Sequence, residues 1–400
     1  MKITSCFFAL LFLASALAGL SLIAVAQKPA PNTHYLALVG TYTNKTASKG
    51  IYAFDFDSAT GKLTLKGIAA ETLDPSWVVI HPNGKFVFAA NESGKQSTIT
   101  AFSLDSTTAK LTQLNQLPAL GEDPCYLSFD KTGKFLFVAN YTSGNVAVFP
   151  ILPDGKLGEH TALVKDAGSL GLNKERQEAP HAHWIGVRPP IGNGALVYVA
   201  DLGLDRVLTY QFHADKGELS GPTVFSSYSN RKYDPSAKLS PGTGPRHAVF
   251  SNSGDPMYVL GELNSTVTVF HMRGTDDFVP PPFQQISTLP EGFTGRNDAA
   301  EIALHPNGKF LYTSNRGADT IAVFDVQRRG GKLSLVANIP TGGQEPRHFA
   351  IDPTGRFLLA ENQNSNSIVV FRIDEATGAL IQVSQAASIP SPVCLAFLHR

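Results

Sequence analysis

One arrangement of apolar and polar positions recurs along most of the chain. A short apolar strand, often preceded by Pro, leads into a turn rich in Gly and Asx, and a second apolar strand follows that ends in a polar residue. A third strand of the type xIxVF comes next, and a Gly-x-Leu turn announces a short fourth strand. No segment has a convincing run of helical period. The clearest copies of the first two strands span residues 75–91, 124–140, 180–201, 245–262, 302–315 and 346–362.

Four short strands that recur about every 50 residues are typical of a β-propeller blade. Six first strands begin near Pro75, Pro124, Pro180, Pro245, Ala299 and Pro346. The N-terminal segments YLALVGTYT, GIYAFDF and GKLTLKG supply a second, third and fourth strand, and SPVCLAFL (391–398) supplies the missing first one. We therefore predict an all-β fold: a seven-bladed β-propeller of four-stranded antiparallel blades, whose ring closes by pairing the N- and C-terminal strands.

The N-terminus has the features of a secretory signal. Lys2 precedes an uncharged stretch, Ile3 to Ala26, which ends in Ala24-Val25-Ala26. Small residues at these positions are typical of a signal-peptidase cleavage site. The alternative is an uncleaved membrane anchor, because the apolar stretch is long enough to span a bilayer. We predict a signal peptide at 1–26, a short linker at 27–33, a propeller domain at 34–400, and export to the periplasm or the extracellular space.

Composition and charge limit the class of partner. The 400 residues are 43% hydrophobic and 16% charged, with a formal net charge of zero, so nothing in the charge predicts binding to nucleic acid or to an anionic membrane. A closed ring makes a monomer sufficient, and we predict a monomer. Cys125 and Cys394, the thiols beyond the signal, lie in apolar strands, which favours a structural role.

Ionisable residues gather where each first strand begins and each second strand ends. These two points are neighbours in an antiparallel hairpin, so Arg246 and Glu262 are expected to lie together. First strands line the channel of a propeller, so the hairpin ends should converge on one mouth. The same argument places Arg347 and His348 beside Glu361 and Asn362, Asp298 beside Asn315 and Arg316, and His181 and His183 near Asp201.

Several of these residues also have a structural interpretation. Polar residues at strand ends often bond the backbone, so Asn91, Asn140 and Asn315 are predicted to be structural, and His81 and His305 to belong to turns. His181 and His183 have the spacing of half a metal site, but no third ligand lies near in sequence, and no metal is predicted. Arg246-His247 and Arg347-His348 would either hold an anion or pair with Glu262 or Glu301. No Gly-x-Ser-x-Gly elbow, Walker motif or dinucleotide fingerprint is present.

Particular motifs resemble a known family. From Tyr35 to Leu398 the chain resembles the propeller-type 6-phosphogluconolactonases, to which the carboxymuconate-lactonising enzymes are related. The RQ-x-x-PHAH, DLGLDR and GPRH motifs carry most of the resemblance. The segments concerned are 168–183 (GSLGLNKERQEAPHAH), 199–212 (VADLGLDRVLTYQF), 242–250 (GTGPRHAVF), 299–302 (AAEI), 314–324 (SNRGADTIAVF) and 342–363 (GGQEPRHFAIDPTGRFLLAENQ).

The resemblance implies a cofactor-independent enzyme that acts on lactones. The residues that match the family's functional positions are His183, Arg246, Glu262 and Arg316, with His181, His247, Glu301, Arg347 and His348 as companions that contact substrate. We expect hydrolysis of a sugar lactone or phospholactone, in which His183 or Glu262 deprotonates a water molecule. Arg246 and Arg316 would hold the oxyanion or a substrate phosphate. The alternatives are an exported propeller that binds a sugar acid or a protein without turnover, and a lactone-forming cycloisomerase.

Overall fold

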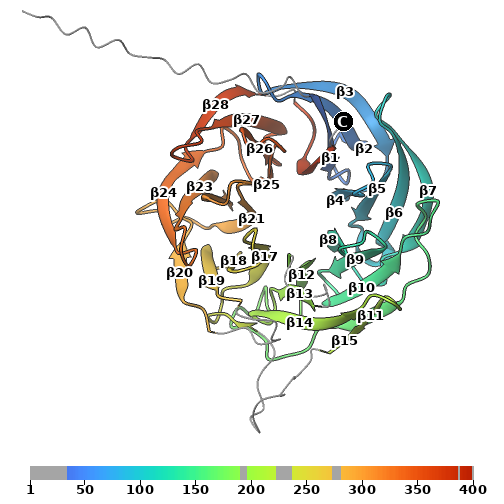
Figure 1. Cartoon of the computed structure of the whole chain (residues 1–400), viewed down its shortest axis with the longest axis horizontal. Coiled ribbons are helices and arrows are strands. Elements are labelled where there is room, and N and C mark those ends of the chain that lie inside the picture. The colour runs from blue at the N-terminus through green and yellow to red at the C-terminus, as the bar shows by residue number, and fades with distance from the viewer. Residues whose placement is uncertain (1–33, 190–195, 222–236, 273–280, 386–387, 399–400) are drawn as a thin grey trace, which may run out of the picture.

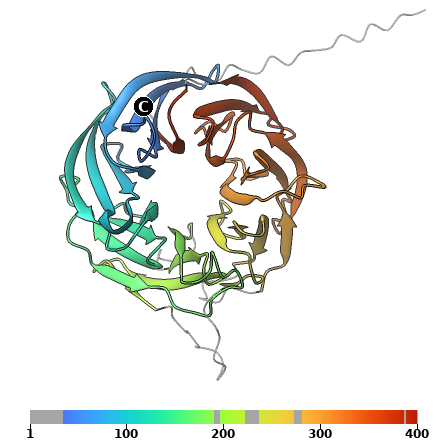
Figure 2. The same ribbon diagram turned by 180° about the vertical axis from the view of Figure 1, so that it is seen from behind.

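Seven antiparallel sheets surround a central channel (Figures 1 and 2). The computed structural model describes residues 34–189, 196–221, 237–272, 281–385 and 388–398. Within these ranges the helical structure consists of one short 3-10 turn, Gly94–Gln96. The prediction of an all-β, seven-bladed propeller is confirmed.

The strands of each blade are given from the channel outwards. Blade 1 contains β29 (Pro392–Leu398), β1 (His34–Thr41), β2 (Gly50–Asp57) and β3 (Lys62–Glu71). Blade 2 contains β4 (Pro75–Ile80), β5 (Phe86–Asn91), β6 (Thr98–Asp105) and β7 (Lys110–Pro118). Blade 3 contains β8 (Pro124–Phe129), β9 (Phe135–Asn140), β10 (Asn145–Pro150) and β11 (Ala162–Lys165). Blade 4 contains β12 (Ala182–Val187), β13 (Leu196–Asp201), β14 (Arg206–His213) and β15 (Glu218–Ser220), with β16 (Ala237–Lys238) beside β14. Blade 5 contains β17 (Pro245–Phe250), β18 (Met257–Gly261), β19 (Thr266–Phe270) and β20 (Gln284–Ser287). Blade 6 contains β21 (Asp298–Leu304), β22 (Phe310–Arg316), β23 (Thr320–Val326) and β24 (Leu333–Pro340). Blade 7 contains β25 (Pro346–Ile351), β26 (Phe357–Asn362), β27 (Ser367–Ile373) and β28 (Leu380–Gln385).

The two ends of the propeller domain meet in blade 1, as predicted. β29 pairs antiparallel with β1, and the register joins Leu36 to Leu398 and Gly40 to Cys394. The C-terminal strand therefore lies among the N-terminal strands in Figure 1. Cys125 and Cys394 are both buried and unpaired, in agreement with their predicted structural role.

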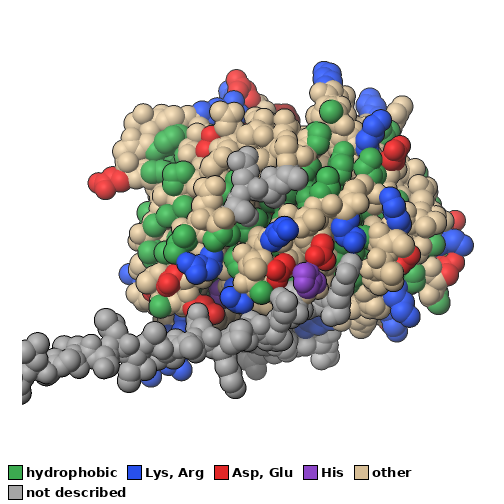
Figure 3. All heavy atoms as spheres, turned by 90° about the horizontal axis from the view of Figure 1, so that it is seen from above, with side chains coloured by type: hydrophobic (Ala, Val, Ile, Leu, Met, Phe, Trp, Pro, Cys, Tyr) green, Lys and Arg blue, Asp and Glu red, His purple; other side chains and the backbone are tan. Residues whose placement is uncertain are grey.

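The core consists of apolar layers between neighbouring blades. β9 is buried along its whole length because both faces of its sheet are covered, and side chains from blades 3 and 4 such as Phe137 and Ile185 share one cluster. The outermost strands have one face toward solvent. The rim visible in Figure 3 accordingly shows apolar side chains interspersed with acidic and basic ones.

Every first strand has a break in its register near its second residue. A bulge of this kind redirects side chains, and bulges are frequent beside active sites. The upper ring consists of the second residue of each first strand, or the third in β21: Ser76, Cys125, His183, Arg246, Ala300, Arg347 and Val393. The lower ring consists of the residue that follows each of these: Trp77, Tyr126, Trp184, His247, Glu301, His348 and Cys394.

The ends of the second strands form a third set, here called the mouth ring. In six of the seven blades, the backbone N–H of the mouth-ring residue donates to the carbonyl of the residue just before the first strand. One example is the hydrogen bond from Glu262 N–H to Gly244 O, at 2.8 Å. In blade 6, Arg316 instead pairs with Asp298 within the ladder. The mouth ring consists of Tyr42, Glu92, Tyr141, Leu202, Glu262, Arg316 and Gln363.

The asparagines just before the mouth ring are structural, as predicted, but their partners are not their own turns. The Asn140 amide donates to Ala119 O at 3.0 Å and the Asn315 amide to Thr288 O at 2.8 Å, so each bonds the connection that enters its blade. Asn91 donates to Leu73 O in the same way. His81 and His305 lie in turns, also as predicted, and each contacts a carbonyl of the next blade's turn.

The predicted signal peptide (1–26) and linker (27–33) lie outside the described residues, as do residues 399–400 of the predicted domain. Among the residues that the structure describes, no helix has the length and apolar character needed to cross a bilayer.

Replacing Asn315 by Ala is expected to lower the free energy of unfolding by about 2–3 kcal/mol, because Thr288 O and the Thr288 hydroxyl lose buried partners. Thermal unfolding of the purified variant measures the loss. The exposed Asn252, which bonds Pro306 O, provides the control: its Ala variant should stay within about 0.5 kcal/mol of the wild type. Equal losses in both variants would contradict the role given to Asn315.

Candidate active site

Glu262 lies at the centre of the charged residues of the mouth. Three guanidinium groups approach its carboxylate: Arg176 Nη2 at 2.5 Å, Arg246 Nε at 3.1 Å and Arg316 Nη2 at 3.1 Å. Arg246 and Glu262 come from the two ends of the β17–β18 hairpin, as the sequence predicted, and Arg316 comes from the neighbouring blade. Arg176 belongs to the connection between blades 3 and 4.

The charges of this cluster control the ionisation of Glu262. Burial by itself raises the pKa of a carboxyl, but Arg316 and Arg246, followed by His183 and Arg176, outweigh it and hold the pKa of Glu262 well below its usual range. Burial and the neighbouring Arg316 and Arg347 lower the pKa of Arg246 to about 10, which keeps it cationic at neutral pH. Glu262 is therefore a permanent anion and a weak proton acceptor.

Two buried N–H groups of the cluster lack a hydrogen-bond partner among the described residues. They are Nε of Arg246 and Nη2 of Arg316, which lie near Glu262 Oε2 without the alignment that a hydrogen bond needs. Arg246 also contacts Ala300 O, and Arg316 Nε donates to Asp298 O at 3.1 Å. The two guanidinium groups are thus held in place by backbone carbonyls and by their ion pairs with Glu262.

His183 is held between the Glu262 cluster and Cys125. Its Nε2 lies 4.0 Å from Glu262 Oε2, and its Nδ1 lies 3.6 Å from Cys125 Sγ. Burial, with the charge of Arg246, brings the pKa of His183 well below its usual value. The imidazole is consequently neutral at pH 7 and able to accept a proton.

The lower ring closes the channel beneath these groups. His247 Nδ1 lies 3.1 Å from both carboxylate oxygens of Glu301, His348 Nε2 lies 3.6 Å from Glu301 Oε2, and His348 Nδ1 lies 2.7 Å from Glu361 Oε2. The Trp77 ring meets both imidazoles edge to face at centroid distances of 5.3 Å. The expected pairs Arg246–Glu262, His247–Glu301 and His348–Glu361 are all present.

This floor carries little charge, in contrast to the mouth. Burial brings the pKa of His247 well below its usual value and that of His348 to about 4. Burial raises the pKa of Glu301, and burial with the nearby Glu301 raises the pKa of Glu361 well above the usual range. These shifts favour the uncharged form of Glu361 and the uncharged form of both imidazoles.

Arg347 forms the opposite wall with Tyr42 and Glu92. Its guanidinium carbon lies 5.3 Å from the centre of the Tyr42 ring, and the Tyr42 hydroxyl donates to Glu92 Oε2 at 2.8 Å. The ion pairs found in the described part of the mouth involve Arg176, Arg246 and Arg316, and none involves Arg347. Arg347 thus adds a further positive charge to the mouth, held against the Tyr42 ring.

His181 is placed differently from the other predicted residues. Its ring stacks on Tyr141 with centroids 4.5 Å apart, and its Nε2 lies 3.1 Å from Glu178. It therefore holds the connection before β12 and does not contact Glu262. The described residues contain no group of three or more His, Cys, Asp or Glu side chains arranged to hold a metal ion.

Sequence reasoning missed Arg176, Tyr42 and Glu92. Arg176 is the Arg of the RQ-x-x-PHAH motif, but it lies in an irregular connection. The pattern of strands does not predict the path of such a connection. Tyr42 and Glu92 occupy the mouth-ring position that Glu262 and Arg316 occupy in their own blades, so an alignment of the repeats would have identified them.

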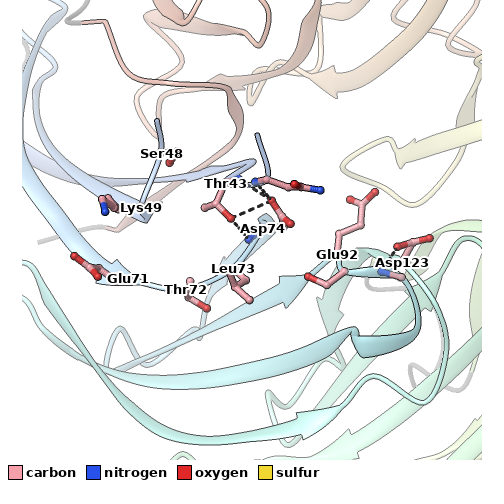
Figure 4. Close-up of a pocket in the computed structure, with 12 residues that line it drawn as sticks. Thr43, Ser48, Lys49, Glu71, Thr72, Leu73, Asp74, Glu92 and Asp123 are labelled. Carbon is pink, nitrogen blue, oxygen red and sulfur yellow. Dashed lines mark hydrogen bonds between the residues drawn. The ribbon is translucent and has the colours of Figure 1, made fainter. Parts of the chain in front are cut away.

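Two clefts open beside the mouth. One, of about 800 Å³, lies between blades 1 and 2 and is lined mainly by residues with polar side chains, Glu92 among them (Figure 4). Its Asp74 accepts hydrogen bonds from the backbone and hydroxyl of Thr43, which makes it a structural residue. The other, of about 500 Å³, includes Arg176 and Asp298 in its lining and adjoins the Glu262 cluster.

Glu262→Gln is expected to lower the free energy of unfolding by about 3–5 kcal/mol, because three guanidinium groups lose their buried counterion. Glu361→Gln is the matched control: an amide replaces a carboxyl whose raised pKa favours the uncharged form, so its melting temperature at pH 7 should stay near that of the wild type. If the two variants are destabilised equally, the ionisation assigned to these carboxyls is wrong.

Comparisons with known proteins agree with this architecture. The family model described as "Lactonase, 7-bladed beta-propeller" matches residues 36–397. A 6-phosphogluconolactonase of Bacillus subtilis is 35% identical over 370 residues, which cover 92% of this chain and 99% of that protein. A 6-phosphogluconolactonase of Formosa agariphila is 34% identical over 77% of this chain and 84% of its own length. The structure of a periplasmic gluconolactonase of Pseudomonas aeruginosa has a TM-score of 0.81 at 31% identity, covering 92% of this chain and 99% of that one. The chain belongs to the family of seven-bladed β-propeller lactonases.

Proposed function

We propose that this protein is a lactone hydrolase that opens a sugar lactone with an activated water molecule. The observation that carries the proposal is the cluster at the mouth: a neutral His183 beside the buried Arg246 and the half-buried Arg316, each of which has one N–H group without an aligned hydrogen bond. Hydrolysis of a lactone needs a proton acceptor for water and a donor for the oxyanion that forms on the carbonyl. The relatives named for phosphorylated and unphosphorylated gluconolactones support the same chemistry.

In this mechanism, His183 Nε2 takes a proton from the water that attacks the lactone carbonyl. Glu262 is too firmly ionised by its arginines to act as that base, and it orients them instead. Arg246 and Arg316 stabilise the tetrahedral oxyanion, and the proton on His183 returns to the ring oxygen as the C–O bond breaks. Arg347, on the opposite wall, contacts the substrate, while His247, Glu301 and His348 form the floor beneath it.

The proposal also covers the class of the enzyme, its oligomeric state and its location. The enzyme is a carboxylic-ester hydrolase that works as a monomer on a small lactone. It is exported after cleavage near Ala26, which the N-terminal sequence and the periplasmic location named for the Pseudomonas relative support. Purified protein from Gln27 onward, assayed by proton release, tests the activity on 6-phosphogluconolactone, gluconolactone and simple unphosphorylated lactones. Turnover without uptake of oxygen from labelled water would indicate a cycloisomerase, and no turnover of any lactone would indicate a binding protein.

Arg246→Ala should lower kcat/KM for the best lactone by about 10²–10³-fold, which is the effect of removing one oxyanion donor. Arg372→Ala, at an exposed position on β27, is the matched control and should leave the rate unchanged. A loss of only a few-fold in Arg246→Ala, with an unchanged melting temperature, would exclude Arg246 from catalysis.

His183→Asn is expected to remove the acidic limb of the pH profile of kcat/KM. The neutral imidazole is the active form, so wild-type activity falls as pH drops through the pKa of His183. Because burial lowers that pKa, the wild-type limb should lie below about pH 6.5, the ordinary value for histidine. Rates measured from pH 4 to 8 give the answer. A limb that persists unaltered in the variant would assign the base to another group.

A further inference from the structure

The connection that carries Arg176, residues 166–181, is anchored at both ends. Gln177 in its second half bonds Leu202 O and Asp205, both through its amide nitrogen at 2.8 Å. Its first residue, Asp166, donates its backbone N–H to Gly144 O at 2.9 Å, and its last, His181, donates its backbone N–H to Asp201 Oδ1 at 2.9 Å. The position of Arg176 beside Glu262 therefore depends on these anchors.

Two buried carboxyl groups face each other between the ends of this connection. Asp166 Oδ1 accepts the Tyr210 hydroxyl at 2.5 Å, and Asp201 Oδ1 accepts the backbone N–H groups of His181 and Leu204. The Oδ2 atoms of both are buried and have no donor among the described residues, although the two side chains are within hydrogen-bond reach of each other. Both residues are about 2% exposed or less.

One proton on either carboxyl removes the need to bury two negative charges side by side. Two carboxylates in contact inside a protein cannot both be ionised, because the repulsion adds to the cost of burying each charge. With a proton on one Oδ2, that group donates to the Oδ2 of the other, and both orphaned oxygens gain a partner. We infer that Asp166 and Asp201 share a proton that holds the two ends of the 166–181 connection together and so positions Arg176 at the mouth.

The groups that face the two carboxyls come from β13, from β14 and from the connection itself. From β14, Tyr210 faces Asp166, and its hydroxyl keeps its own proton because burial raises its pKa. From the connection, His181 faces Asp201 with its backbone N–H, while its ring lies against Tyr141. Arg206, the register partner of Asp201, belongs to the same neighbourhood. Burial, then the adjacent Asp201, raises the pKa of Asp166 well above its usual value, which is consistent with a retained proton.

The inference requires one hydrogen-bond donor between the side chains of Asp166 and Asp201, and Asn variants at these two positions test that requirement. In Asp166→Asn or Asp201→Asn, the new amide donates to the remaining carboxylate, so each single variant should keep the connection closed. In the double variant Asp166→Asn/Asp201→Asn, each Oδ1 stays engaged with Tyr210 or with the backbone N–H groups of His181 and Leu204, so two NH2 groups face each other without an acceptor between them. Trypsin acting after Lys174 or Arg176, followed by mass spectrometry at pH 8, should cleave the double variant about tenfold faster than either single variant. A double variant as resistant as the single ones would overturn the inference.

The linkage to pH gives an independent readout. Because the pKa of Asp166 is raised in the folded protein, its stabilising contribution is complete below the ordinary Asp value and is lost as pH rises toward the folded value. The melting temperature of the wild type should therefore fall relative to that of Asp166→Asn between pH 4 and pH 8. A constant difference would contradict the shared proton.

The positioning role rests on the proposed lactonase function, but proteolysis and melting do not. If the protein turns over lactones, the double variant should raise KM more than it lowers kcat, and each single variant should retain both. An equal loss in all three variants would contradict the positioning of Arg176, whereas absence of turnover in the wild type would count against the proposed function alone.

Discussion

The ladder between β1 and β29 is the constraint on which the site depends. It closes the ring, so the seven second strands end around one channel and cannot spread apart. Tyr42 and Arg316, which are far apart in sequence, are thereby brought to the same mouth. Each blade contributes one position to the upper ring, one to the lower ring and one to the mouth ring. The three rings therefore supply most of the site, and Arg176 from the connection before blade 4 and Glu361 from β26 complete it.

Burial forces the ionisable groups of the channel to be compensated in one of two ways. At the mouth, Glu262 keeps its charge because three arginines surround it. In the floor, burial and the nearby Glu301 raise the pKa of Glu361, which favours its protonated form. Removing charge from water is costly, so a carboxyl follows whichever route its neighbours allow. The result is a cationic mouth above a neutral floor, which suits a reaction that builds negative charge on a carbonyl oxygen.

Much of the fold and part of the site could be predicted from the sequence. The alternation of apolar strands and turns gave the blades, and the antiparallel hairpin rule correctly paired Arg246 with Glu262 and Asp298 with Arg316. The role of the first-strand bulges could not be predicted, because a one-residue break leaves the apolar pattern unchanged. Arg176 was missed for a different reason: the direction of an irregular connection depends on long-range hydrogen bonds such as those of Gln177. Protonation states depend on burial, which only the packed structure defines.

Blade 4 departs from blades 2, 3, 6 and 7 at the residue just before the mouth ring, and this departure affects the site. In blades 2, 3, 6 and 7 an Asn before the mouth ring donates its amide to a carbonyl of the incoming connection. Blade 4 has Asp201 at that position, and a carboxylate cannot donate in this way. It accepts backbone N–H groups instead, and its remaining oxygen faces Asp166 at the start of the same connection. This connection carries Arg176, which pairs with Glu262. Asp in place of Asn at this position therefore anchors the connection that places Arg176 at the mouth.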